Sequence, residues 1–244
     1  MKKILSAILL VGVMLGCKDE SLSPYLEPES NVIGFGQFVN PGDNSLVPPD
    51  NSFYDQGDVD ADIFFTGTNA ASEVNLKLQW ISVKKDVNIT NIELYIEWDE
   101  AYTDDDSNQL IASHGVGEHK PTYPNGKLWK TITASSASRT PVDIKITYAD
   151  MYTLFQNEKY DYGTGEVDVF SAGNLYTGNT DRTSQRFYTD RTATINTKTV
   201  DLASDTFILG WRFIADDGRA FGTWYDSVCL ETVGFSCHAQ WSTE

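Results

Sequence analysis

The chain has 244 residues with 35 acidic and 18 basic side chains, so its formal net charge at pH 7 is −17. A protein this acidic repels nucleic acid and anionic lipid headgroups, which excludes DNA and RNA as expected partners. The length is sufficient to bury a real core as one large β domain or as two small ones.

Residues 1–16 have the pattern of a secretory signal peptide. Lys2 and Lys3 give a positive start, residues 4–13 are apolar, and a small residue precedes Cys17. The apolar run is shorter than the roughly 20 residues that cross a bilayer as a helix. Residues 14–17, Met-Leu-Gly-Cys, resemble the bacterial lipobox, so we expect Cys17 to carry the lipid that anchors the protein. An ordinary signal peptide with a chance cysteine is the alternative.

Lys18, Asp19 and Glu20 follow directly and resemble the short export signal of Bacteroidota surface lipoproteins. A solvated start of a linker is the alternative. Residues 17–31 are polar and contain proline, which predicts a flexible tether before a domain at residues 32–244. The expected location is the outer membrane, with the lipid-anchored domain exposed at the cell surface.

Residues 32–39 form a first candidate strand, and residues 40–60 are expected to be a loop. Strict alternation of apolar and polar residues then predicts three half-buried strands, with apolar residues at positions 74, 76, 78 and 80, at 92, 94, 96 and 98, and at 207, 209, 211 and 213. Ile81 and Val83 continue the first run on the opposite parity, which indicates either a bulge or burial on both faces. Residues 128–133 and 142–147 add two strands.

Thr147 and Asp150 form a capping pattern before Met151 and Phe155, which predicts a short helix at about 148–156. Further on, Asp217-Gly218 predicts a hairpin turn into residues 219–225. Between these elements, residues 157–190 are rich in Gly, Asn, Thr and Tyr with little period. We expect a long loop insertion at about 157–200, and a long loop is a candidate contact surface. The elements together favour an all-β fold, an antiparallel β-sandwich with one short helix.

Cysteine usage fits a secreted protein. With Cys17 assigned to lipid, Cys229 and Cys237 remain as an even pair, which predicts a disulfide across seven intervening residues. A disulfide that closes such a short loop stabilises the folded state by about 2–3 kcal/mol. A metal site built from this pair and His238 would need more ligands.

The sequence carries no standard motif for nucleophilic catalysis, and its histidines are scattered at positions 114, 119 and 238. An enzyme is therefore not expected. Because paired carboxylates can hydrolyse glycosides, a glycoside hydrolase remains the enzymatic alternative.

No cofactor is expected apart from a candidate calcium ion. Asp104, Asp106 and Asn108 offer hard oxygen ligands, as does the run of aspartates at positions 58, 60 and 62. Gln109 stands where an EF-hand loop requires glycine, and a solvated turn explains the acidic residues equally well. A weaker candidate is a transition-metal site on residues 114, 118 and 119.

Aromatic residues raise the question of sugar binding, because aromatic faces stack on pyranose rings. Trp80, Trp98 and Trp211 share strand faces with Leu and Ile and are expected in the core. The better candidates for an exposed platform are Trp129, Tyr95 and Tyr176.

Four parts of the sequence carry a family resemblance: residues 88–98, residues 144–150 with the helix that follows, residues 210–221, and the element around Cys229 and Cys237. Over about residues 70–155 and 205–244 the chain resembles SusE-like surface lipoproteins of Bacteroidota, which accompany TonB-dependent outer-membrane transporters. The resemblance implies an Ig-like β-sandwich without catalysis. It supplies no binding residues, and the insertion at about 157–200 departs from its pattern.

Two functional classes follow from the resemblance and from the expected outer-membrane location. The first is an accessory or interaction subunit that docks on an outer-membrane β-barrel or transporter complex, with glycan binding as an added activity. The second is a stand-alone surface glycan-binding module. An exposed row of Trp or Tyr favours glycan binding, and an exposed apolar patch favours docking.

Overall fold

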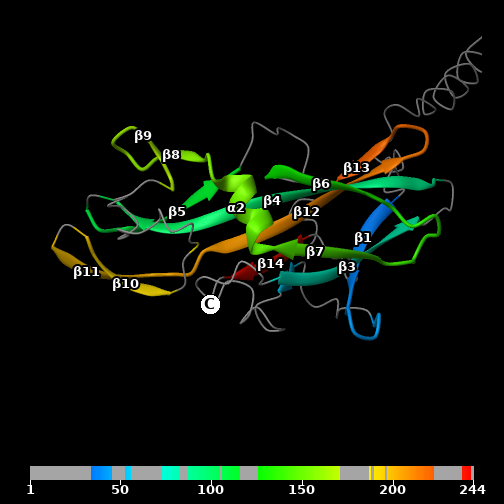
Figure 1. Cartoon of the computed structure of the whole chain (residues 1–244), viewed down its shortest axis with the longest axis horizontal. Coiled ribbons are helices and arrows are strands. Elements are labelled where there is room, and N and C mark those ends of the chain that lie inside the picture. The colour runs from blue at the N-terminus through cyan, green and yellow to red at the C-terminus, as the bar shows by residue number, and fades with distance from the viewer. Residues whose placement is uncertain are drawn as a thin grey trace, which may run out of the picture. The chain divides into compact units, whose positions relative to one another are not determined.

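The computed structural model describes residues 34–45, 53–55, 73–82, 87–104, 106–115, 126–170, 187, 190–195, 197–222 and 238–242. Contacts divide the chain after Val32, and all of these residues belong to the second part, Ile33–Glu244. They form a mostly β fold in which antiparallel sheets pack as a sandwich beside one short helix (Figure 1). The predicted fold class is therefore confirmed.

The larger sheet has seven strands in the order β2-β14-β12-β4-β5, with β13 pairing β12 and β6 pairing β4. Its pairs are antiparallel except for β14 and β2, which run parallel. The strands are β2 (Phe53–Asp55), β4 (Ile89–Thr103), β5 (Gln109–His114), β6 (Lys127–Thr133), β12 (Thr206–Ala215), β13 (Ala220–Gly222) and β14 (His238–Ser242). Strand β2 lies inside the segment that the sequence assigned to a loop, because three residues are too few to show a period.

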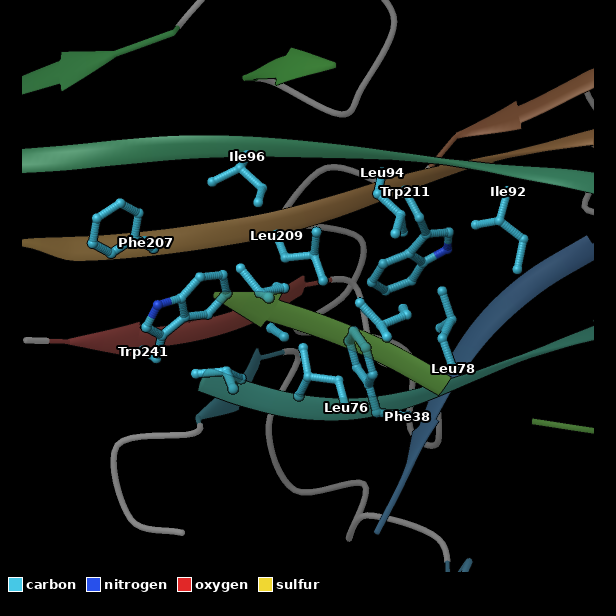
Figure 2. Packing of buried hydrophobic residues seen from close by; sticks show 14 of the residues in the cluster. Phe38, Leu76, Leu78, Ile92, Leu94, Ile96, Phe207, Leu209, Trp211 and Trp241 are labelled. Atoms are coloured by element: carbon cyan, nitrogen blue, oxygen red, sulfur yellow. The ribbon is translucent and has the colours of Figure 1, made fainter. Parts of the chain in front are cut away.

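The smaller sheet consists of β1 (Gly34–Val39), β3 (Glu73–Ser82) and β7 (Val142–Thr147), paired antiparallel with β3 in the middle. Its inner side chains, such as Phe38, Leu76 and Leu78, meet those of β4, β12 and β14 from the larger sheet (Figure 2). The packed layer between the two sheets is the main core of the protein.

Alternation along the strands explains which side chains enter this core, since successive residues point to opposite faces. Every apolar position predicted from the period of two on β3, β4 and β12 is buried, including Trp80, Trp98 and Trp211. The second half of β3, Leu78–Ser82, is buried on both faces without a shift in its pairing to β1. The opposite parity of Ile81 thus reflects two-sided burial and not a bulge.

The helix α2 (Tyr148–Phe155) begins where the capping pattern predicts. Thr147 accepts a hydrogen bond from the backbone N–H of Asp150 at 3.1 Å, and the Asp150 carboxylate accepts one from the N–H of Thr147 at 3.0 Å. This capping box satisfies two backbone donors that would otherwise lack partners. The apolar side of the helix then places Tyr148, Met151 and Phe155 in the main core.

The predicted loop insertion is only partly a loop. It contains the hairpin β8 (Lys159–Asp161) with β9 (Glu166–Asp168) and the hairpin β10 (Arg191–Ile195) with β11 (Lys198–Leu202). Val169 and Phe187 are buried in the main core, so parts of this segment contribute to the core. These strands are short and the apolar residues isolated, which is why the sequence shows no period there.

Candidate functional site

The inner face of β4 changes from apolar to polar as the strand leaves the main core. Trp98, Glu100 and Tyr102 share this face because they alternate along the strand, and Glu100 is completely buried. The neighbouring edge strand β5 places His114 opposite Trp98 in the pairing register. The β8–β9 hairpin adds Tyr160 and Tyr162, so three elements enclose one carboxylate.

The Glu100 carboxylate accepts two short hydrogen bonds on one oxygen. The hydroxyl of Tyr162 lies 2.6 Å from Glu100 Oε2, and Nε2 of His114 lies 2.8 Å from the same atom. The His114 side chain has no exposed surface and Tyr162 is also buried. Burying a carboxylate is costly unless donors compensate it; the Tyr162 hydroxyl is one donor, and His114 is the second in the tautomer that carries its proton on Nε2.

Aromatic rings complete the enclosure. The imidazole of His114 stacks on Trp98 with ring centroids 4.2 Å apart, and Tyr160 meets it edge-on at 5.2 Å. Tyr102 packs against Tyr162 at 5.0 Å, and burial raises the pKa of the Tyr102 hydroxyl. The other ring nitrogen of His114, Nδ1, is buried without a hydrogen-bond partner.

This cluster has the groups of a general acid–base site but not its access. A substrate must come within hydrogen-bond reach of a catalytic carboxylate or imidazole. Glu100 and His114 are both sealed beneath Trp98 and the tyrosines. The arrangement can fix the β8–β9 hairpin onto the β4–β5 end of the sheet, and we interpret it as a structural contact.

On the opposite face of β4, Asp99 accepts a hydrogen bond from the Ser113 hydroxyl at 2.5 Å. Burial raises the pKa of the Asp99 carboxyl, while the Ser113 hydrogen bond and the nearby His114 lower it and only partly offset that effect. Asp99 is thus a partly desolvated acid within a strand.

The calcium candidates lie in the turn between β4 and β5. Asp104 Oδ1 accepts from the backbone N–H of Asn108 and its Oδ2 accepts from the Asn108 side-chain amide, each at 2.8 Å. These hydrogen bonds hold the pKa of Asp104 below its usual range. The Lys198 ammonium reaches the backbone carbonyl of Asp106 at 3.2 Å. The hydrogen bonds from Asn108 to Asp104 close a turn. Across the described residues, no three acidic, histidine or cysteine side chains form a metal-binding group.

Only one residue of the transition-metal candidate, His114, lies within the described residues. His114 turns inward onto Glu100, whereas residues 118 and 119 lie outside the described residues, as do the aspartates at 58, 60 and 62. No sequence motif predicted Glu100 or Tyr162 as site residues. The only pattern that points to them is a spacing of two residues, which puts side chains on the same face of a strand. Trp98, Glu100 and Tyr102 have this spacing, and so do Tyr160 and Tyr162.

The expectation of an exposed Tyr95 is wrong, because its side chain is 8% exposed. Its hydroxyl donates to Glu93 Oε2 at 2.8 Å, and the Arg212 guanidinium lies 5.7 Å from the ring centroid. Arg212 also bonds Glu93 Oε2 through Nε at 2.6 Å. Burial, followed by the Glu93 contact, raises the pKa of the Tyr95 hydroxyl.

Trp129 is half-buried because β6 contains a bulge. Leu94 pairs with Lys130 and Tyr95 pairs with Leu128, which leaves Trp129 as an extra residue without a partner in the register. The extra residue reverses the alternation, so Leu128 is 50% exposed while Trp129 packs against the main core. Tyr176, the third aromatic candidate, lies outside the described residues.

A pocket of about 480 Å³ opens where the β10–β11 hairpin meets the start of β5. Its lining residues are Gln109, Asp190, Arg191, Thr192, Asp201, Leu202 and Ala203. The hairpin is fastened there by Arg191, whose guanidinium donates to the carbonyl of Ala101 at 3.1 Å and of Ala203 at 3.3 Å. Gln109 donates its side-chain amide to the carbonyl of Asp201.

The residues predicted for lipidation, for export to the cell surface and for the disulfide lie outside the described residues. These are Cys17, the segment Lys18, Asp19 and Glu20, and the pair Cys229 and Cys237. Lipidation, export and the disulfide therefore remain predictions. No helix among the described residues is both long and apolar enough to cross a bilayer.

The fold and the site define a β-sandwich domain with a closed polar cluster at one end of its larger sheet. Comparison with protein families, curated proteins and solved structures finds no match to this chain.

Proposed function

We propose that this protein is a non-catalytic surface lipoprotein, anchored in the outer membrane through lipid on Cys17, and that it acts as an accessory or interaction subunit of an outer-membrane protein complex. The partner class is an outer-membrane β-barrel or a transporter complex, as the resemblance to SusE-like lipoproteins implies. The signal segment that ends at Cys17 supports the address.

The observation that carries the interaction role is the kind of apolar surface that the domain exposes. The large apolar side chains exposed among the described residues form two separate groups along one edge of β4, Leu110 and Ile111 on β5 and Leu128 on β6, and docking requires only one of the two groups. No aromatic side chain reaches that exposure among the described residues whose burial the structure gives, a set that leaves out residues 34–35 and 53–55. Aliphatic surface without aromatic faces supports protein docking over carbohydrate stacking.

A non-catalytic role is supported by the closure of the Glu100 and His114 cluster, because neither side chain has exposed surface and the two bond to one another. Glycan capture remains the second candidate activity. It is favoured by Trp129, whose ring keeps part of its surface accessible beside Lys130, with the ammonium 5.4 Å from the ring centroid.

The test is purification of the full-length lipidated chain from native membranes in mild detergent. The proposal predicts that an outer-membrane barrel or transporter co-purifies with the wild-type chain in a fixed ratio. Recovery of the chain alone would contradict it. Binding of the same preparation to a glycan array, compared with Trp129→Ala, separates the second candidate, because a glycan module should lose its signal with the variant.

A further inference from the structure

The edge of the larger sheet at β5 is open in the part of the chain that the structure describes. Strand β5 pairs with β4 on one side and with no described strand on the other. A free edge presents unpaired backbone N–H and C=O groups that can accept another strand. Proteins commonly block such edges with charged residues or proline, and residues 109–114, Gln-Leu-Ile-Ala-Ser-His, contain no Lys, Arg, Asp, Glu or Pro.

The two faces of this edge differ. Leu110 pairs with Tyr102 and shares its face with the polar cluster, whereas Ile111 pairs with Ala101 on the other face. Ala101 packs on the β10–β11 hairpin, which has its own small core of Ala193, Ile195 and Leu202. Ile111 is 64% exposed beside that hairpin. Covering an isoleucine that is 64% exposed on an unblocked edge removes apolar surface from water, which favours binding.

The pocket described above adjoins this edge. Gln109 lines it and points to the same face as Ile111, because the two are separated by one residue along the strand. Asp190 and Asp201 contribute carboxylates to the lining, while the Arg191 guanidinium is held by backbone carbonyls. The Asp201 carboxylate accepts from the Thr192 hydroxyl at 2.8 Å, and an ionised carboxylate has about four acceptor positions, so a cationic donor fits there.

We propose that the open edge of β5 binds an extended segment of a partner protein as an added strand, with an apolar side chain on Ile111 and a basic side chain in the pocket beside Gln109. This inference rests on the proposed role as an interaction subunit and names the surface and the kind of segment it takes. Main-chain hydrogen bonds along the edge supply affinity, and alternate side chains supply specificity.

Charge decides between a basic partner and a second copy of this chain. The chain carries a net charge of −17, and the turn beside β5 adds Asp104 and Asp106. A second copy would bring the same acidic surface against itself, which is unfavourable at close range. A segment with lysine or arginine meets complementary charge, and its binding should weaken as salt screens that attraction.

The experiment places a photo-crosslinking amino acid at position 111 of the full-length chain in its own cells, with position 128 as the matched exposed control. The inference predicts a cross-link from position 111 to one partner. Mass spectrometry of the joined peptide should then give a segment with alternating apolar residues and a lysine or arginine. Position 128 should not give this product.

Variants of the same full-length chain supply the second readout. Ile111→Lys and Asp201→Asn should each reduce the co-purified partner about tenfold, while Leu128→Lys should leave it unchanged. Thermal unfolding of each purified variant checks that the fold is intact, which the exposure of Ile111 and Leu128 favours. The loss with Asp201→Asn should also shrink at high salt.

The outcomes separate the two proposals. If the wild-type chain retains no partner, the interaction role fails and this inference fails with it. If the partner is retained by Ile111→Lys but lost with Leu128→Lys, the interaction role stands and the β5 edge is the wrong surface. A cross-link from position 111 to a second copy of the chain, or to an acidic segment, would also overturn the inference.

Discussion

Oε2 of Glu100 lies 2.8 Å from Nε2 of His114, and neither side chain has any exposed surface. A carboxylate in such a place must be matched by donors, because breaking a buried pair leaves an uncompensated charge. Tyr162 supplies the second donor from a segment that the sequence assigned to a surface loop. The contact therefore makes the β8–β9 hairpin, which lies within the 157–200 segment, part of the fold.

Replacing Tyr162 by Phe should lower the free energy of unfolding by about 1–3 kcal/mol, because the ring remains while a buried carboxylate loses a donor. Chemical denaturation of the purified domain measures the change. Tyr152→Phe is the matched control, since the Tyr152 ring packs on Phe170 and its hydroxyl has no hydrogen bond with the described residues. Equal effects of the two variants would mean that the hydroxyl of Tyr162 does not stabilise Glu100.

Shortening residues 160–190 to a turn should destabilise the domain strongly, in contrast to the behaviour of a true surface loop. The reason is that Phe187 lies in the main core against Trp98 and Phe207, with ring centroids at 5.0 and 4.9 Å. Phe187→Ala alone should cost about 3–5 kcal/mol. A melting temperature unchanged by either alteration would mean that Phe187 and the segment around it do not stabilise the fold.

Gly36→Ala should cost about 1–3 kcal/mol, because an added methyl group would overlap the indole of Trp211 and force the core to shift. Trp211 has no room to yield, since it is buried and meets Phe38 edge-on at 5.2 Å. Gly42→Ala provides the control, because no atom lies within 4 Å of the added methyl group. Thermal unfolding of both variants makes the comparison, and a loss at Gly42 as large as at Gly36 would refute it.

Asp99→Asn should increase stability at neutral pH and lose that advantage on acidification. Burial raises the pKa of Asp99 in the folded state above its unfolded value, so the folded state favours the protonated acid. Any stability that this group gives is therefore present below the unfolded pKa and lost as the pH rises through the folded pKa. Asparagine removes the desolvated charge and keeps an acceptor for Ser113. The measurement is the free energy of unfolding of both proteins from acidic to neutral pH. A difference between the two proteins that stays the same at every pH would argue against this explanation.

The alternation of apolar residues and the capping pattern correctly predicted strands and the helix. The apolar positions on β3, β4 and β12 and the box at Thr147 and Asp150 are local patterns, and local backbone geometry alone converts them into structure. These elements were enough to predict a sandwich with one helix.

Features that depend on distant parts of the chain could not be predicted in this way. Tyr95 looked exposed by parity, yet Arg212, 117 positions further along the chain, reaches its ring and shares Glu93 with it. The bulge at Trp129 arises from register against β4, which no residue of β6 encodes by itself. The closed cluster at Glu100 likewise needs β4, β5 and β8 together.

The most direct test of the central claim, a lipid-anchored surface protein, compares the wild-type chain with Cys17→Ala by membrane fractionation and by digestion of intact cells with an external protease. If lipid on Cys17 is the anchor, the wild-type chain is found in the outer-membrane fraction and is cleaved from outside, whereas Cys17→Ala moves to the soluble fraction, because several acyl chains hold the protein in the membrane. A Cys17→Ala chain that stays firmly bound to the membrane would show that the anchor lies elsewhere.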